Sequence, residues 1–254
     1  YELHLTWKNF TGEKKILLVE ADPKEAKRLT LKFKKDKHII VYNEAITGKS
    51  ENLFLNISNN PAMASFLKRK NVSPLFWGEK NYQQKIKSRI KIKSKNLDEF
   101  LKNNNLNIDF LKIDVEGQEP EILLSSKKIY KYLLGIRSEV SFTSINSNNT
   151  NQKSGTFVLL HEKLVSQDFI LLNLDYRGQG DHYSGLISPN DNYGILQNTD
   201  AVWIKNPKKF YNSNNEHVLF KYLSFLILNN AYDLCFFLLE KNFKKHKNFR
   251  NIKN

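Results

Sequence analysis

The sequence predicts an α/β fold built on an open, mostly parallel sheet. Residues 15–42 alternate an apolar run, an amphipathic stretch and a second apolar run, which is the pattern of a strand–helix–strand unit. Residues 110–115 form a further short apolar run that contains Asp114 and is closed by Glu116 and Gly117, as in a buried strand with acids at its carboxyl end. Open α/β sheets bind their ligands at that edge, so these acids mark the expected site.

The strand–helix–strand unit carries clear start signals. Residues 15–19 are apolar enough for a buried strand. Asp22 is a good N-cap and Pro23 suits the first helical position, so we expect a helix that runs to about Lys35. Residues 38–42 then form the next strand. Together these elements predict one half of a nucleotide-binding fold.

Glu20 stands at the tip of the first of these strands. In dinucleotide-binding folds, an acid at the tip of the second strand binds the ribose hydroxyls, about 20 residues after the glycine-rich turn that follows the first strand. Counting back that far from Glu20 reaches Tyr1. We therefore expect a first strand and its glycine-rich loop upstream of Tyr1. An ordinary exposed acid at a strand end is the alternative for Glu20.

Residues 96–119 carry the most specific pattern in the chain. Asn96 can cap a helix that begins with Leu97 and Asp98, a short spacer follows, and Lys112–Glu119 then reads Lys-Ile-Asp-Val-Glu-Gly-Gln-Glu. This segment resembles the FkbM-type family of S-adenosylmethionine-dependent methyltransferases, and the likeness extends more weakly over most of the chain. The resemblance implies a Rossmann-like class I methyltransferase sheet, mostly parallel with an antiparallel last strand.

The same resemblance implies where S-adenosylmethionine binds. Glu20 would hold the ribose hydroxyls, with Ala21 beside it. The turn after the 38–42 strand would border the adenine, where two apolar residues could pack on the purine and Glu44 or Asn43 could bind its amino edge. A plain strand-to-hairpin turn is the alternative reading of this segment. The cofactor contacts expected from the family are Glu20, Ala21, Asn43, Glu44, Ala45, Ile46 and Asp114.

The remaining elements follow from apolar periodicity and turn residues. The expected strands are 52–57, 85–93, 134–140, 169–174 and 199–205, and the expected helices are 97–102, 118–126 and 157–165. From Glu216 onward the period is purely helical, and Asn229–Asn230 divides it into two short antiparallel helices. These helices could cap the sheet, form a dimer interface or bind a neighbouring domain. We therefore divide the chain into an N-terminally incomplete methyltransferase domain, 1–206, and a helical extension with a basic tail, 207–254.

The expected chemistry is methyl transfer to a hydroxyl, which needs a positioned acceptor and a group that takes its proton. Asp114 and Glu116, two residues apart, point to the same side if the strand continues that far. Either could act directly as the base. Alternatively, Asp114 and Glu139 could hold a magnesium ion that orients and acidifies the acceptor; the metal-free scheme is preferred. Glu139, His182 and Tyr183 are the candidate contacts to the acceptor.

The acceptor implied by the resemblance is a sugar, a glycan or a small natural product. The formal charge of +14 invites an RNA methyltransferase as the alternative, but only six of the 40 basic residues are arginine, the residue that nucleic-acid readout favours. The charge is better explained as a solvated lysine-rich surface, so nucleic acid is an unlikely partner. A third possibility is a methyltransferase-like module that has lost catalysis and serves inside a multidomain protein.

Composition limits the class of protein further. With 254 residues and 40% hydrophobic composition, the chain can bury one full core with a small appendage. The single cysteine, Cys235, excludes an internal disulfide and a cysteine-cluster zinc site, which favours a reducing, cytoplasmic location. The most apolar region, 218–239, is interrupted by polar residues and falls short of a transmembrane segment.

Overall fold

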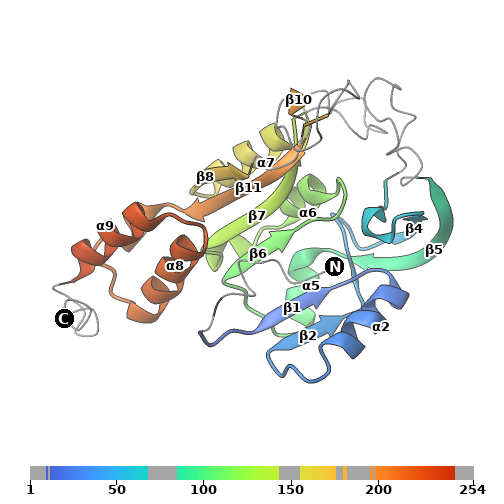
Figure 1. The fold of residues 1–254 in the computed structure, drawn as a ribbon, viewed down its shortest axis with the longest axis horizontal. Coiled ribbons are helices and arrows are strands. Elements are labelled where there is room, and N and C mark those ends of the chain that lie inside the picture. Colours follow the sequence, from blue (N-terminus) through green and yellow to red (C-terminus); the bar gives the residue numbers. More distant parts are fainter. Residues whose placement is uncertain are drawn as a thin grey trace, which may run out of the picture.

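The structure, a computed structural model, describes residues 10, 12–67, 85–142, 155–175, 180–181, 195–196 and 198–243. It is a mixed α/β fold in which strands lie at the centre and helices cover them (Figure 1). The predicted fold class is confirmed. The strand and its loop expected upstream of Tyr1 stay a prediction.

A four-stranded sheet forms the centre of the molecule. Its order is β6 (Phe110–Ile113), β7 (Gly135–Ser141), β11 (Asn198–Lys205) and β8 (Phe169–Asp175). β6 runs parallel to β7, whereas β11 is antiparallel to both of its neighbours. The closing antiparallel strand is therefore present as predicted, and it lies between β7 and β8.

The predicted strand–helix–strand unit forms a separate parallel pair. β1 (Ile16–Val19) and β2 (Ile39–Tyr42) are joined by α2 (Pro23–Lys32). The Asp22 side chain caps α2 by accepting a hydrogen bond from the Lys24 backbone N–H at 2.9 Å. The N-cap prediction is confirmed, although the helix ends at Lys32 and not near Lys35.

A three-stranded sheet flanks this unit. β5 (Ile86–Lys95) lies between β3 (Ala45–Ile46), to which it is parallel, and β4 (Asn52–Ser58), to which it is antiparallel. A short 3-10 helix, η1 (Pro61–Met63), follows β4, and Asn56 and Ser65 then pair through a single β-bridge. This bridge brings residues 65–67 back toward the end of β6.

Three helices cover one face of the four-stranded sheet: α5 (Leu97–Asn103), α6 (Glu119–Ser125) and α7 (Gly155–Ser166). Asn96 caps α5 as predicted, since its side chain accepts from the Glu99 N–H at 2.8 Å. The main core lies between these helices and the sheet. Its fully buried members include Phe100, Leu123, Ile136, Leu160, Leu164 and Trp203.

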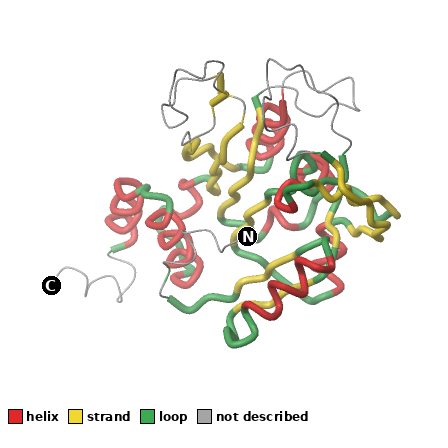
Figure 2. The backbone as a smooth tube through the Cα atoms, turned by 45° about the vertical axis from the view of Figure 1, so that its right-hand side comes forward, coloured by secondary structure: helices red, strands yellow, loops and turns green. Residues whose placement is uncertain are grey.

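The C-terminal helices pack on the opposite face. α8 (Glu216–Leu228) and α9 (Tyr232–Asn242) bury Val202 and Ile204 of β11, which alternate with the core residues on the other side of that strand. η2 (Ile129–Lys131) leads into β7, and η3 (Pro207–Phe210) leads from β11 toward α8. Figure 2 shows the helix pair beside the sheet, at the end away from β1, β2 and α2.

The helix pair therefore caps part of the sheet, which was one of the three roles expected for it. A role in dimer or domain contact stays a prediction, as does the domain boundary after residue 206. β9 (Gly180–Asp181) and β10 (Ile195–Leu196) form a further, two-stranded antiparallel sheet. Among the described helices, none has both the length and the apolar character needed to cross a membrane.

Candidate active site

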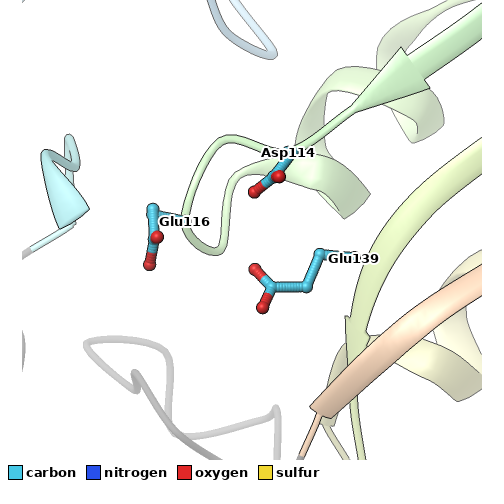
Figure 3. Close-up of side chains that lie close together, drawn as sticks. All are labelled: Asp114, Glu116 and Glu139. Atoms are coloured by element: carbon cyan, nitrogen blue, oxygen red, sulfur yellow. The ribbon is translucent and has the colours of Figure 1, made fainter. Parts of the chain in front are cut away.

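Three carboxylates meet at the carboxyl ends of β6 and β7. One oxygen each of Asp114, Glu116 and Glu139 lies within 4.8 Å of the others. Figure 3 shows Asp114 and Glu116 on the loop that follows β6, and Glu139 reaching from β7 toward the same space. The sequence predicted Asp114 and Glu116 as catalytic residues and Glu139 as an acceptor contact or as a partner of Asp114 in a metal site, and the fold brings all three together.

The loop after β6 brings Asp114 and Glu116 together in a way that the sequence did not predict. The two acids were expected to point to the same side if the strand continued that far, but β6 ends at Ile113, so strand alternation does not align them. Glu116 instead adopts a left-handed backbone with φ 56°, and Gly117 follows with φ 104°. This tight turn reverses the chain before α6. Glycine adopts such a backbone freely, whereas for Glu116 it is an uncommon conformation.

Asp114 is also held by a cation. The Lys112 Nζ lies 2.7 Å from Asp114 Oδ2, and both side chains are partly exposed. Lys112 and Asp114 are two residues apart in the Lys-Ile-Asp segment, so this ion pair is a local contact within the motif. The ion pair fixes the direction of the Asp114 carboxylate, which suits Asp114 to orient a partner.

Glu139 has the environment of a proton acceptor. Burial, followed by the neighbouring charges of Asp114 and Glu116, raises its pKa to about 7, although a hydrogen bond from Asn198 acts in the opposite direction. The Asn198 Nδ2 donates to Glu139 Oε1 at 2.7 Å. A carboxyl group with a pKa near neutrality can take up and release a proton efficiently.

The same three carboxylates could hold a divalent cation. Hard ions such as Mg²⁺ bind clustered carboxylate oxygens, usually together with water. The predicted metal pair was Asp114 and Glu139, and the fold adds Glu116 to them. Lys112 already balances the charge of Asp114, and the raised pKa of Glu139 allows that residue to be protonated and neutral near pH 7. The three side chains can therefore lie close together without a bound ion.

The predicted ribose acid, Glu20, lies directly after β1. Its Oε1 accepts a hydrogen bond from the Asp22 backbone N–H at 2.8 Å, which fixes the carboxylate at the start of α2. Burial raises the pKa of Glu20. The Asn43 Nδ2 donates to the Glu20 backbone carbonyl at 2.9 Å. Two predicted cofactor residues, from the ends of β1 and β2, are thus in direct contact.

A hollow of about 280 Å³ adjoins these residues. It is lined by Ala21, Pro23, Asn43, Glu44 and Ala45, and across from them by residues 90–93 of β5. The carboxylate of Glu44 lies 2.6 Å from Lys95 Nζ. Ala45 borders the hollow but has no surface exposed to water, and Ile46 packs against the core.

Comparison with known proteins identifies the family. The model of the methyltransferase FkbM domain matches residues 3–177, which is more than half of the chain. The chain belongs to the FkbM methyltransferase family. No curated protein matches it. Among solved structures, a protein of the NADB-Rossmann superfamily from Streptococcus agalactiae is 13% identical and aligns over 100% of this chain and 98% of its own, with a TM-score of 0.35.

The FkbM domain carries all of the predicted site residues that the structure describes. Glu20, Asn43, Asp114, Glu116 and Glu139 all lie within the matched range. His182 and Tyr183, the predicted acceptor contacts, lie outside the described residues. The assigned roles of all these residues stay predictions.

The sequence did not predict two polar residues that contact the carboxylate cluster or its loop, Asn198 and Glu119. Asn198 is 59 residues from the Glu139 that it contacts, and no local pattern marks it. For Glu119 the sequence alone suggests only the general preference of acids for a helix N-terminus. Its side chain is instead buried and turned back to the loop that carries Glu116, and burial raises its pKa to about 8. The motif itself, in which Glu119 follows Gly117 by two residues, is the signal that could have found it.

Proposed function

We propose that this FkbM-family protein is an S-adenosylmethionine-dependent O-methyltransferase that acts on a hydroxyl of a sugar, a glycan or a small natural product. The observation that carries the proposal is the group of three carboxylates, Asp114, Glu116 and Glu139, at the ends of two parallel strands. This edge is where open α/β sheets bind ligands. Family membership supports methyl transfer as the reaction.

The residues at the ends of β1 and β2 suit a nucleoside-type cofactor. Bound S-adenosylmethionine would supply an electrophilic methyl group on its sulfonium. Glu20 offers carboxylate oxygens to ribose hydroxyls, and its contact with Asp22 holds it in one orientation. Asn43 and Glu44 offer polar groups beside the hollow to an adenine edge, and Ala21 lines the same space. Ala45 and Ile46 would support this wall from behind, and Asp114 would face the cofactor from the loop after β6.

In this proposal the acceptor hydroxyl passes its proton to Glu139. The Oε1 of Glu139 accepts from Asn198, which leaves Oε2 as the atom that takes the proton. Asp114 and Glu116 were the predicted bases. Asp114 is paired with Lys112, so we assign it the orientation of the acceptor, together with Glu116. Metal-free transfer remains our preferred scheme, with Mg²⁺ on the three carboxylates as the alternative.

The charge around the cluster favours a neutral acceptor over a nucleic acid. Arg137 next to Glu139 is bound at 2.7 Å by Asp200 and at 3.1 Å by Asp175, so its charge is already engaged. The surrounding acids would repel a phosphate backbone despite the formal net charge of +14 of the whole chain. A glycan or small alcohol meets no such repulsion.

The test is transfer of a radiolabelled methyl group from S-adenosylmethionine to a panel of sugars, glycans and hydroxylated small molecules, with either Mg²⁺ or a chelator present. Glu139→Gln should slow transfer by about 10²-fold or more, since general-base catalysis contributes that much. Asp114→Asn should also slow it, whereas the exposed control Asp36→Asn should not.

An Asp114→Asn variant with full activity would remove Asp114 from the mechanism. If the intact protein does not bind S-adenosylmethionine in calorimetry, the enzyme proposal fails and an inactive module remains.

A further inference from the structure

Glu119 is a first-turn residue of α6 whose carboxylate points back to the preceding loop. It is 2% exposed. Its Oε1 accepts the backbone N–H of Val115 at 2.7 Å, and its Oε2 accepts the backbone N–H of Gly117 at 2.9 Å. Both oxygens are therefore engaged by backbone donors on either side of Glu116. A general preference for acids at a helix N-terminus would not require this double contact.

The residue between the two donors is in an unfavourable conformation. Glu116 has φ 56°, which places its β-carbon close to the following carbonyl oxygen, so a non-glycine residue rarely adopts it without support. Two hydrogen bonds from its neighbours to one rigid, buried carboxylate supply that support. The direction of the Glu116 side chain, toward Asp114 and Glu139, depends on this backbone conformation.

A second contact holds the same turn from the other side. Ser65 Oγ donates to the backbone carbonyl of Glu116 at 2.9 Å, and Ser65 is itself 3% exposed. The Leu67 N–H donates to Ser65 Oγ at 3.1 Å, and Asn56 Nδ2 donates to the Ser65 carbonyl at 3.0 Å. A chain of hydrogen bonds thus links β4 to the loop that carries Glu116.

We propose that Glu119 is a positioning residue that, together with Ser65, holds Glu116 in the left-handed conformation that brings its carboxylate to Asp114 and Glu139. The catalytic consequence rests on the proposed methyl-transfer function, whereas the structural part does not. Glu119 does not touch the acceptor, so it acts through the geometry of the cluster. Small displacements of catalytic groups, of about 1 Å, lower rates by about 10²-fold.

The variant that tests this is Glu119→Gln, which keeps the shape but replaces one accepting oxygen with an amide NH2 that cannot accept a backbone N–H. We expect kcat for methyl transfer to fall by about 10-fold to 10²-fold, with an unchanged S-adenosylmethionine Kd in calorimetry. The melting temperature reports whether the variant is folded. Glu121→Gln, an exposed acid on the same helix, is the matched control and should behave as the wild type.

A crystal structure of each variant separates this proposal from the proposed function. In Glu119→Gln we expect Glu116 to leave the left-handed region and its carboxylate to move away from Asp114 and Glu139. Ser65→Ala, which leaves Glu119 intact, should shift the same loop less and lower kcat less. A Glu119→Gln structure with Glu116 unmoved would overturn the proposal. If the wild type transfers no methyl group to any acceptor, the proposed function fails, and the structures alone decide the role of Glu119. If Glu119→Gln does not fold, the Ser65→Ala structure becomes the test. A Glu116 loop that does not move in Ser65→Ala would overturn the proposal that Ser65 and Glu119 together hold Glu116.

Discussion

Asn198 holds Glu139 by a hydrogen bond of 2.7 Å between neighbouring strands. The contact exists because β11 runs antiparallel to β7, with Asp200 opposite Glu139 in the register and Asn198 two residues further along. An N–H donor stabilises the charged form of a carboxylate and so lowers its pKa. Asn198 therefore opposes the burial that raises the pKa of Glu139 to about 7. Their separation of 59 residues in sequence hides this relationship until the chain folds.

Asn198→Ala should raise the pKa of Glu139 further. The lost bond favours the carboxylate, so more alkaline conditions are needed to ionise the group, and the rising limb of the pH–rate profile should move to higher pH. Hydrogen bonds to charged groups contribute about 1.5–3 kcal/mol, equivalent to a pKa change of roughly 1 or more. Carbon-13 NMR titration of the Glu139 carboxyl measures it directly. The control is Asn173→Ala, an exposed amide on β8. An unchanged or lower pKa would contradict the assignment.

Glu139 should also make stability depend on pH. Its pKa is raised from 4.5 to about 7 in the folded protein, so the folded state binds the proton more tightly than the unfolded chain. This contribution is fully present below pH 4.5 and is lost as the pH rises through about 7. At about 1.4 kcal/mol per pKa unit, the effect amounts to at most about 3.5 kcal/mol.

Glu139→Gln removes this titration, so the variant should gain stability relative to the wild type as the pH rises from 5 to 8. Urea denaturation of both proteins at pH 5 and at pH 8 gives the difference in unfolding free energy between variant and wild type at each pH. Comparison with the wild type at each pH cancels other groups, including Lys205, whose pKa burial lowers to about 8. A difference between variant and wild type that stays constant across this range would show that Glu139 titrates normally.

Glu20→Ala should weaken S-adenosylmethionine binding by about 10-fold to 10²-fold, because the loss of charge-assisted hydrogen bonds costs about 1.5–3 kcal/mol. Isothermal titration calorimetry measures the change. Since Glu20 also accepts the Asp22 N–H, a thermal melt must accompany the titration. Glu25→Ala is the control, because Glu25 lies in the first turn of the adjoining helix α2 and pairs there with Arg28. Equal affinities for wild type and Glu20→Ala would reject the ribose role.

Gly135→Ala should destabilise the packing between β7 and α8. A β-carbon at residue 135 would lie 2.2 Å from a ring carbon of Phe225, which stacks on Phe110 with ring centroids 4.5 Å apart. Overpacking of this kind costs about 1–3 kcal/mol. Urea denaturation should show the loss, and Phe225→Leu should relieve part of it in the double variant. Additive losses in the double variant would mean that the two residues do not collide.

Much of the fold could be predicted because its signals are local. Asp22 and Asn96 cap the helices that their spacing predicted, and the apolar runs became β1, β2, β6, β7 and β11. Helix ends were less certain, since α2 ends three residues before Lys35. Capping and periodicity involve contacts within a few residues, so the sequence alone records them.

The candidate site was only partly predictable. Asp114, Glu116 and Glu139 were identified from their positions at expected strand ends, but the left-handed turn at Glu116 and the partners Asn198, Glu119 and Ser65 were not. The contacts of Asn198 and Ser65 depend on strand register and on a β-bridge, which leave no local pattern. The contact of Glu119 depends on the direction of a buried side chain, which the motif marks only through its spacing.

The sequence by itself determined which acids this protein has at the carboxyl ends of its strands, which family it belongs to and where most of its strands and helices begin. Only the tertiary structure decided that Asp114, Glu116 and Glu139 share one space, that Asn198 binds Glu139, and that Glu119 binds the loop that carries Glu116. The physical reason is that strand-end residues are fixed by local periodicity, whereas the distance between carboxylates and their burial depend on packing between distant segments.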